Sequence, residues 1–490
     1  MLSSSVTVGV LRTATGVVLL VALIVGPLNF ASTRPEGFHL LIGLCALAGA
    51  LWIAARVASQ SIFPPSKWVW AAVCTCVGVA CFWSLQPPAP LPEFTTHHLA
   101  RVFARWPRSM VPRDPASLIL WAISALGALL ATWDLARAPK WRLAFVVAMV
   151  GTGVVAATVG LLQNATHAHG IYWEQGPRFP GMFFGPFYHH TSAGAYLNSV
   201  WPLAAVLALS GFRDGTSKTR WIGALGGIAT VLLLVAHAGH ISRFPQVIAV
   251  LVLIALIAWL RPWNLLPPSH GVRVAFIAAV VAIAGSVALF GAGKVRTIQD
   301  RWSQLQLTHL LGRGAATPSA PAADWPRLMR GDLFVPSQHA NYVLGDRGAA
   351  YATAWRAMEA RPWLGWGPGG WTAAAAAESQ DPFIRTFFLY LQFTHNDYLQ
   401  TVVEWGLVGA AGWAFLVFGG IAHAAVRLLP YPAHDLFGAG AIAALLALLA
   451  QSVVDFPLQV PAIQLNAVVL IALAWSAAGP ADRLPISTCP

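Results

Sequence analysis

The sequence predicts an all-α polytopic membrane protein, with about 12 transmembrane helices and a large extracytoplasmic loop between helices 9 and 10. Composition is the first reason. Of 490 residues, 57% are hydrophobic and only 10% are charged, whereas soluble domains carry about 25% charged residues. The 22 tryptophans are the second reason, because amphipathic rings concentrate at membrane–water interfaces.

Long apolar runs are the third reason, because about 18–25 apolar residues are enough to cross a bilayer as a helix. Such runs lie near residues 13–31, 38–57, 68–86, 117–136, 143–163, 191–211, 221–239, 244–260, 274–293, 397–426, 436–454 and 461–478. They divide the chain into N-terminal helices 1 to 9 (1–293), an extracytoplasmic loop domain (294–395) and C-terminal helices 10 to 12 (396–490). The first run is too long for the apolar part of a signal peptide, so we expect it to remain as a helix.

Basic residues predict the orientation of these helices. With the N-terminus in the cytoplasm, the cytoplasmic loops hold 13 Lys and Arg residues and the short loops on the other side hold seven. The long loop holds the other ten of the 30, and long loops translocate largely regardless of charge. We therefore expect both termini in the cytoplasm. The 164–190 loop, the His240–Arg243 turn and His395 then face the other side.

The net charge of +12 indicates anionic lipid or a phosphate-bearing lipid substrate rather than nucleic acid, because the basic residues are scattered over loops. Cysteines do not suggest a disulfide or metal site. Cys45, Cys74, Cys76 and Cys81 lie inside apolar runs and Cys489 is next to last, so they are interpreted as structural thiols.

Two histidine pairs, His237 with His240 and His189 with His190, have a spacing that metal ligands also use. No acidic or cysteine residue lies beside them in the sequence, so we interpret them as histidines near span ends and predict no metal site.

The loops contain three local patterns. Residues 94–106 have the periodicity of an amphipathic helix lying on the outer leaflet. Residues 346–361 predict a helix that Pro362 stops. Gly365–Gly370 formally matches a Gly-x-Gly-x-x-Gly nucleotide motif, but it follows a helical pattern and contains a proline. We interpret it as a tight turn that returns the loop to the membrane.

A polar segment meets an apolar one at Thr394–Gly409. Asn396 or Asp397 is suited to cap a helix there, which leaves His395 and Glu404 unexplained. Glu404 is expected about 10 Å along the helix from its start, inside the apolar region, where an ionisable group is by default functional or ion-paired. His395 is the candidate proton acceptor, because imidazole titrates near neutral pH.

Three further charged residues are expected on the same side of the membrane. Arg178 and Arg243 are either snorkelling side chains or phosphate ligands, since a guanidinium binds phosphate in a bidentate geometry. Residue chemistry alone leaves both alternatives open. Asp455 stands at the outer end of a span and either orients a catalytic group or pairs with an arginine.

These stretches together resemble the C-terminal signature of the O-antigen ligase and polymerase superfamily of membrane glycosyltransferases. The stretches are Leu364–Gly369, His395–Gln400 with Glu404–Gly409, and Ser452–Pro461. The resemblance covers about 345–465, and the loop with Arg178 and the Ser242–Arg243 pair resemble weaker N-terminal elements of the family. At Tyr188–Thr191 the sequence departs from the asparagine-containing turn that members often carry.

The resemblance implies a metal-independent, cofactor-free transfer of a glycan from an undecaprenyl-diphosphate carrier to an acceptor hydroxyl. It places this reaction at the periplasmic face of the bacterial inner membrane. The family's catalytic histidine corresponds to His395, and its diphosphate-binding arginines to Arg178 and Arg243. Members are ligases to lipid A–core in lipopolysaccharide biosynthesis, polysaccharide polymerases or protein O-oligosaccharyltransferases. The first is our expectation here, and the others are alternatives.

The residue chemistry agrees with this expectation. Guanidinium groups stabilise a diphosphate as it leaves, and His395 accepts the proton of the acceptor hydroxyl. Supporting roles fall to Asp397, Tyr398, Glu404 and Asp455. A transporter or flippase of the lipid-linked glycan would instead carry charged residues along a path through several spans. A binding-only scaffold leaves Glu404 without a purpose.

Overall fold

The computed structural model describes residues 2–60, 66–85, 115–174, 182–213, 216–240, 242–266, 343–378 and 393–477. Within these ranges, nine helices are long and apolar enough to cross a membrane. They are α1 (Leu2–Leu28), α2 (Pro35–Ser59), α3 (Lys67–Ser84), α5 (Pro115–Ala136), α6 (Pro139–Ala165), α7 (His190–Arg213), α8 (Ser217–Gly239), α9 (Arg243–Leu260) and α18 (Asp397–Leu428). Two shorter apolar helices follow, α19 (Leu436–Ser452) and α20 (Pro461–Trp475). The chain is therefore an all-helical, multi-pass membrane protein, as the composition predicts.

Eleven of the predicted spans correspond to these helices. The predicted span at 274–293 and the predicted amphipathic helix at 94–106 lie outside the described residues. So does most of the 294–395 loop, from which the structure describes α15 (Val343–Ala360) and α16 (Trp371–Glu378). The end of α15, two residues before Pro362, confirms the predicted proline stop.

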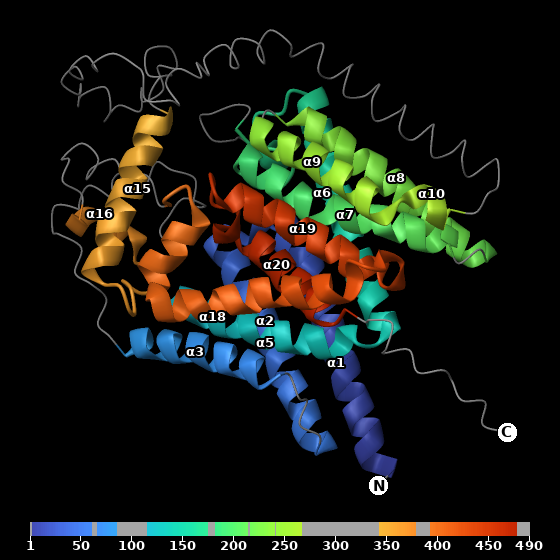
Figure 1. Ribbon diagram of the computed structural model, residues 1–490, viewed down its shortest axis with the longest axis horizontal. Coiled ribbons are helices and arrows are strands. Elements are labelled where there is room, and N and C mark those ends of the chain that lie inside the picture. Colours follow the sequence, from blue (N-terminus) through green and yellow to red (C-terminus); the bar gives the residue numbers. More distant parts are fainter. Residues whose placement is uncertain are drawn as a thin grey trace.

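The interior of the bundle is formed by α7, α19 and α20, which lie between α6, α8 and α9 on one side and α18, α5 and α3 on the other (Figure 1). α19 and α20 are buried at almost every position, which is why their sequences are apolar on all sides. α7 and α8 approach closely through glycines: a Cβ on Gly211 would lie 2.3 Å from the backbone nitrogen of Gly223. Small residues permit this contact between membrane helices.

One end of the bundle collects the turns after α1, α6, α8 and α19 together with the start of α18. Hydrogen bonds join them in pairs: Tyr172 Oη donates to Leu28 O (2.5 Å), Asn164 Nδ2 to Gly239 O (2.7 Å) and Asn396 Nδ2 to Val453 O (2.9 Å). We call this the histidine end, because His189, His240 and His395 lie there. The loops that the charge distribution predicts to share a side do meet at this end. Which side of the membrane the end faces remains a prediction.

The opposite end holds arginine–carboxylate pairs, and we call it the arginine end. Arg12 and Arg56 both pair with Asp134, the former at 3.1 Å. Arg142 pairs with Asp435 at 2.7 Å. Because these arginines belong to α1, to the end of α2 and to the start of α6, the pairs fasten several helices to one another.

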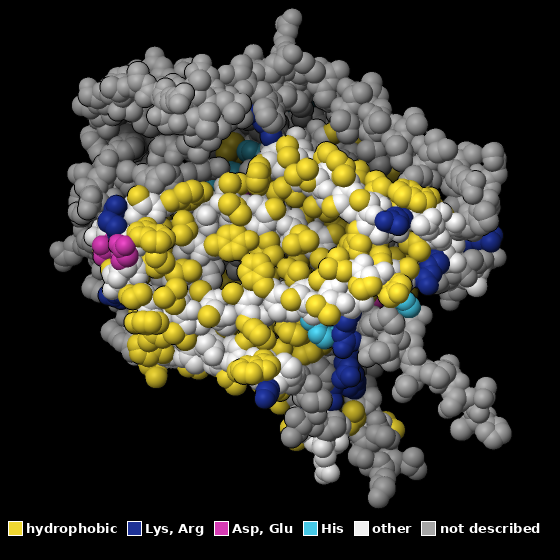
Figure 2. Space-filling view, viewed as in Figure 1, with side chains coloured by type: hydrophobic (Ala, Val, Ile, Leu, Met, Phe, Trp, Pro, Cys, Tyr) yellow, Lys and Arg dark blue, Asp and Glu magenta, His cyan; other side chains and the backbone are white. Residues whose placement is uncertain are grey.

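Figure 2 shows one face of the molecule, where hydrophobic side chains cover the middle and the few charged side chains lie toward the edges. Large apolar residues on this and other helix faces are well exposed, for example Ile53, Leu225 and Ile254, at 56%, 64% and 59%. Exposure of this extent is expected for side chains that contact lipid rather than water.

Candidate active site

The first helix of the C-terminal set is broken near its start. Gly406 in α18 has a φ of 63° and a ψ of 179°, which are not helical values. The turn after α15 satisfies the backbone groups that the break leaves free: Leu407 N–H donates to Pro362 O (2.7 Å), and Trp366 N–H donates to Val403 O (2.8 Å). Backbone polar groups at membrane depth have to find partners within the protein, so the turn and the break depend on each other.

The glycine-rich segment Gly365–Gly370 is this docking turn. Gly365, Gly367 and Gly369 have positive φ values of 70°, 90° and 75°, a conformation that glycine adopts without strain. A Cβ on Gly365 would lie 2.5 Å from the backbone nitrogen of Gly406. The prediction of a tight turn is confirmed, and the close approach of α18 explains the glycines without a nucleotide.

Glu404 fastens the same turn to α18. The side chain is only 7% exposed, and its Oε1 accepts a hydrogen bond from Gln400 Nε2 (3.0 Å). The backbone N–H groups of Gly369 and Trp371 also bond to the carboxylate. Because Trp371 begins α16, the carboxylate lies at the N-terminus of that helix, where negative charge is favoured. The depth of Glu404 in an apolar segment thus has a structural explanation.

Asp397 joins three elements and is not the helix cap. The cap of α18 is Asn396, whose Oδ1 accepts from Leu399 N–H (3.0 Å). Asp397 is 2% exposed and accepts hydrogen bonds from Ser452 Oγ (2.9 Å), Leu458 N–H (2.9 Å) and Gln459 Nε2 (3.0 Å). These bonds hold the turn between α19 and α20 against the start of α18.

His395 occupies a constrained position directly before α18. Its φ of 55° lies in the left-handed region, which costs a residue with a side chain about 1–3 kcal/mol, and its backbone carbonyl accepts a hydrogen bond from Tyr351 Oη (3.0 Å). The ring stands edge-on to Phe456, with centroids 4.9 Å apart. Nδ1 faces Asp455 Oδ1 at 3.8 Å. This distance suits an ion pair but is too long for a hydrogen bond, and among the described residues Nδ1 has no hydrogen-bond partner.

Asp455 is the carboxylate of this arrangement. It is 6% exposed, and burial alone raises the pKa of a carboxyl group. Interactions with His395, with the charge of His189 and with the Thr191 hydroxyl outweigh burial and hold the pKa of Asp455 below its usual range. Asp455 therefore stays ionised, and its partners are imidazoles. The second of the two predicted roles, a pair with an arginine, does not receive support from these contacts.

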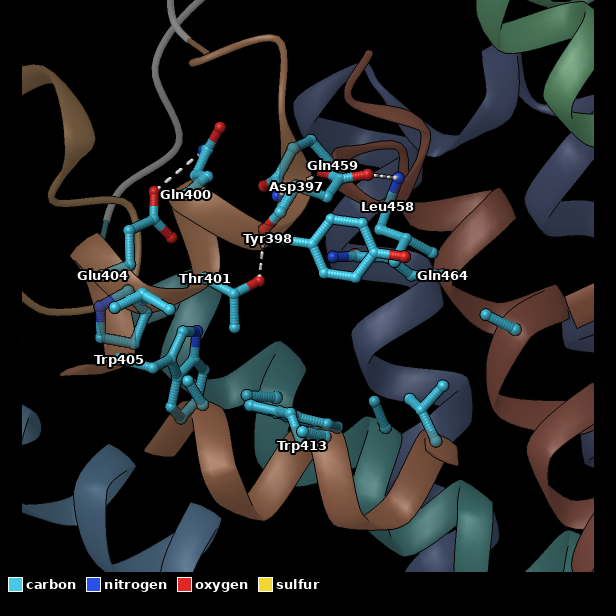
Figure 3. A pocket seen from close by; sticks show the side chains of 18 of the residues that line it. Asp397, Tyr398, Gln400, Thr401, Glu404, Trp405, Trp413, Leu458, Gln459 and Gln464 are labelled. Atoms are coloured by element: carbon cyan, nitrogen blue, oxygen red, sulfur yellow. Dashed lines mark hydrogen bonds between the residues drawn. The ribbon is translucent and has the colours of Figure 1, made fainter. Parts of the chain in front are cut away.

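A cavity of about 350 Å³ lies beside these residues, between α5, α18, α20 and the docking turn (Figure 3). Most of its wall is apolar. The polar lining consists of Asp397, Tyr398, Gln400, Thr401, Glu404, Gln459 and Gln464, among others. Tyr398 is 36% exposed and its hydroxyl donates to Leu449 O (2.8 Å), so the ring forms part of the cavity wall while the hydroxyl ties α18 to α19. Apolar cavities with a few convergent polar groups are the usual form of ligand sites.

Arg243 is the first residue of α9 and lies at the histidine end, half-buried. The helix start packs against α7, because a Cβ on Gly194 would lie 2.6 Å from Pro245 Cβ. Arg178, the other predicted diphosphate ligand, lies outside the described residues.

The turn before Arg243 is held by a histidine pair. His240 Nδ1 accepts from Ser242 N–H (3.2 Å), so His240 Nε2 carries a proton when the ring is neutral and donates it to His237 Nδ1 (3.0 Å). These bonds occupy both ring nitrogens of His240 and Nδ1 of His237. Among the described residues, no group of three or more His, Cys, Asp or Glu side chains is arranged to hold a metal ion.

Comparison with known protein families gives a match for part of the chain. Residues 228–414 match the Wzy_C family, described as O-antigen ligase. Residues 228–414 are an O-antigen ligase domain. Members of this family are membrane glycosyltransferases, so the protein is an enzyme of the O-antigen ligase or polymerase type, which implies a lipid-linked glycan donor and an acceptor. No curated protein matches the chain significantly.

The O-antigen ligase domain contains Arg243, the docking turn, His395 and Glu404. Asp455 and Arg178 lie outside the matched residues. The structure nevertheless brings Asp455 to within 3.8 Å of His395, so the candidate site of the ligase domain extends into the turn before α20.

Sequence reasoning missed several residues of this site. Thr191, Gln451 and Phe456 carry no signal of their own, because a hydroxyl, an amide and a phenyl ring are ordinary near span ends. From the sequence, His189 is interpreted only as a histidine near a span end. The signal that was available is its place beside Thr191 at the start of a span, on the side predicted for His395.

Proposed function

We propose that the protein transfers a glycan from an undecaprenyl-diphosphate carrier to an acceptor hydroxyl on lipid A–core or another glycan. The reaction takes place at the histidine end, which faces the periplasm with both termini in the cytoplasm. The observation that carries the proposal is the His395–Asp455 pair, in which a partly exposed imidazole (19%) lies beside a buried carboxylate. An imidazole held by a carboxylate is a common form of general base.

In this proposal His395 removes the proton of the acceptor hydroxyl as its oxygen attacks the anomeric carbon. The bond from that carbon to the phosphate oxygen breaks, and the diphosphate leaves with the electron pair. Arg178 and Arg243 bind the diphosphate and stabilise the charge it gains. Asp455 stabilises the imidazolium of His395, while Asp397, Tyr398 and Glu404 fix the surrounding turns. Because guanidinium groups supply the positive charge, we expect transfer to continue in the presence of a metal chelator.

The domain boundaries of the proposal follow the same division. Helices 1 to 9 (1–293) carry the arginines, the periplasmic loop domain (294–395) supplies the docking turn and His395, and helices 10 to 12 (396–490) carry the supporting carboxylates. Polysaccharide polymerisation and protein O-glycosylation remain the alternatives, because the same base and diphosphate ligands serve a sugar or a serine hydroxyl equally well.

The test is a His395→Ala exchange in purified protein, reconstituted in vesicles that contain a synthetic undecaprenyl-diphosphate disaccharide and lipid A–core. We expect loss of transfer by at least about 10³-fold, since the base acts on the reacting hydroxyl, with the melting temperature unchanged. His434→Ala at the arginine end is the matched control and should keep the wild-type rate. Transfer retained in His395→Ala would refute the assignment of the base. Movement of the donor across the membrane without a new glycosidic product would identify a transporter instead.

A further inference from the structure

The cavity beside α18 has a polar end and an apolar end (Figure 3). Its polar lining includes residues from the first turns of two helices that begin at the histidine end, with Gln400 in α18 and Gln464 in α20. Its apolar lining includes deeper positions, such as Ile471 in α20 and Ala125 in the middle of α5. The polar end therefore lies toward the histidine end, and the apolar end reaches into the bundle.

The apolar end of the cavity also reaches the outer surface of the bundle. Ala414 and Phe418 line the cavity and are both exposed, Phe418 at 47%. Exposed apolar side chains of a membrane helix contact lipid. The volume of about 350 Å³ is near the lower end of the range of ligand sites, about 300–1,000 Å³. An apolar chain longer than the cavity can therefore begin inside it and continue into the bilayer.

Gln464 directs hydrogen-bond donors away from its neighbour Trp121. Trp121 Nε1–H donates to Gln464 Oε1 (2.5 Å), and an indole nitrogen can only donate. The amide oxygen thus faces Trp121, which leaves the amide nitrogen for another group. Among the described residues, Gln464 Nε2 has no hydrogen-bond partner. Because the side chain lines the cavity and is only half-buried, its two N–H groups are available to a bound molecule.

Thr372 offers a second polar group from another helix. It is the second residue of α16 and lines the cavity. Within the part of the chain that the structure describes, its hydroxyl makes no hydrogen bond. A hydroxyl both donates and accepts, whereas an amide N–H donates. Thr372 and Gln464 are therefore suited to a molecule that carries hydroxyl groups, which an isoprenoid or acyl chain alone does not.

The charges of the lining do not suit a diphosphate. Asp397 and Glu404 contribute carboxyl groups, and no Lys, Arg or His is found among the described residues that line the cavity. A carboxyl group is negative or neutral but never positive, whereas proteins hold phosphate groups with positive charge and charge-assisted hydrogen bonds. Sugar hydroxyls, in contrast, can donate to carboxyl oxygens. Charge complementarity therefore favours an uncharged, hydroxyl-bearing head over the diphosphate of the donor.

A phenyl ring connects the cavity wall with the candidate base. Phe393 lines the cavity and stacks on Phe456, with ring centroids 4.6 Å apart. The ring of His395 stands edge-on to the same Phe456, at 4.9 Å. The cavity wall and the imidazole thus share one neighbour, so the polar end of the cavity and the candidate base belong to one site.

We propose that the cavity is the acceptor subsite and that it binds an uncharged glycolipid. The sugar hydrogen-bonds to Gln464 and Thr372 at the polar end, and the apolar chain lies along α5 and α20 and continues into lipid. The assignment rests on the proposed function, since only a transferase has an acceptor. In the transfer step the attacking oxygen belongs to this sugar, its proton goes to His395, and the diphosphate leaves with the electron pair of the broken bond.

The first test is photo-crosslinking of the full-length protein in vesicles that contain a glucosyl diacylglycerol with a diazirine on one acyl chain. We expect label on cavity residues such as Ala125 and Ile471, displaced by unlabelled glucosyl diacylglycerol but not by undecaprenyl diphosphate. Label spread evenly over the lipid-facing helices would overturn the proposal. Displacement by undecaprenyl diphosphate would also overturn it and would assign the cavity to the donor.

The second test measures transfer from the undecaprenyl-diphosphate disaccharide to glucosyl diacylglycerol. Thr372→Val and Gln464→Leu should each raise the KM for the glycolipid about 3- to 10-fold, the effect of losing one hydrogen bond between uncharged groups. The kcat at saturating glycolipid and the KM for the donor should not change. Thr372→Val leaves the Trp121 contact intact, so it decides the test if Gln464→Leu does not fold. A lower kcat with an unchanged KM would make both residues packing residues and overturn the proposal, as would a wild type that transfers to lipid A–core but not to the glycolipid.

The matched control is Thr158→Val. Thr158 lies in α6, does not line the cavity, and donates its hydroxyl to Val154 O of its own helix (2.8 Å), so the variant should keep the wild-type kcat and KM. His395→Ala separates the two hypotheses, because it should lose transfer and keep the crosslinking pattern. If it keeps transfer, the proposed function fails, and label in the cavity still shows that the glycolipid binds there. If it loses transfer and the label is absent from the cavity, only the acceptor assignment fails.

Discussion

Two buried aspartates at opposite ends of the bundle differ in their partners rather than in their burial. Asp134 at the arginine end is 4% exposed and Asp455 at the histidine end is 6% exposed. Asp134 pairs with the guanidinium groups of Arg12 and Arg56, while Asp455 faces the imidazole of His395. A guanidinium keeps its proton at every physiological pH, whereas an imidazole gains and loses one near neutrality.

The difference shows how one chain separates structure from chemistry. At the arginine end, Asp134 and Asp435 pair with guanidinium groups, which carry a permanent positive charge. These pairs hold helices together and take no part in proton transfer. At the histidine end the carboxylate holds groups that exchange protons. Two other acids of that end, Asp397 and Glu404, take hydrogen bonds from neutral donors, so they add rigidity without holding the imidazoles. A third, Glu174, pairs with Arg34, as the acids of the arginine end pair with arginines.

Among the buried acids, Asp455 should show the largest effect on transfer when its charge is removed. Asp455→Asn keeps the shape but cannot stabilise an imidazolium, and the same exchange in a Ser-His-Asp triad lowers kcat by about 10⁴. Because the His395–Asp455 contact is 3.8 Å, we expect a smaller fall of about 10²–10³-fold. Single-turnover transfer measures it. A rate within threefold of wild type would show that the two ends do not differ in the way proposed.

Removing the charge of Asp134 should lower the stability of the protein and leave the transfer rate unchanged. Asp134→Asn leaves Arg12 and Arg56 without their counter-charge, and breaking a buried pair costs about 3–5 kcal/mol. Arg12 and Arg56 are 33% and 19% exposed, so the lower figure of about 3 kcal/mol applies. Thermal unfolding in detergent should shift down, while kcat of the folded fraction should not change. A loss of kcat at full folding would contradict a purely structural arginine end.

The sequence predicts the helices better than it predicts the site. Apolar runs and basic loops specify the spans, because burial in lipid requires uniform apolarity and each basic loop residue carries its own signal. The proline stop and the glycine turn are local in the same way. The break at Gly406 is not predictable locally, since its hydrogen bonds go to residues 362 and 363, some forty positions away.

Roles of the acids also required the structure. Glu404 stood out because of its depth, yet its partners are the docking turn and Gln400. The sequence leaves the cap open between Asn396 and Asp397, and the structure shows that it is Asn396. Which partner an acid takes is decided by packing between α18, α19 and α20, and no spacing within one segment encodes that.

Variants of Asp397 test whether this residue acts only by holding the turn that carries Asp455. Asp397→Ala would leave Ser452, Leu458 and Gln459 without their acceptor, at a cost of about 1–3 kcal/mol for the buried donors, and should lower transfer about tenfold by loosening the turn that carries Asp455. Asp397→Asn should stay within about threefold, because the Gln459 amide can reverse and accept from the new N–H group. Transfer rates and melting temperatures of both variants measure this. An Asn variant as inactive as the Ala variant would mean that the charge of Asp397 itself takes part.

The smallest expected effect is on the stability of the folded protein at low pH. Folding lowers the pKa of Asp455, so the unfolded chain binds this proton more readily and the stabilisation grows with pH. It is fully present above the unfolded pKa of about 4 and is lost as the pH falls through the folded value. The gap in melting temperature between wild type and Asp455→Asn should therefore narrow when the pH is lowered from about 5 to about 3. Asp134→Ala serves as a comparison at the arginine end. A gap that widens on acidification would show that Asp455 is not held in its charged form, and the contrast between the two aspartates would then rest on the arginine end alone.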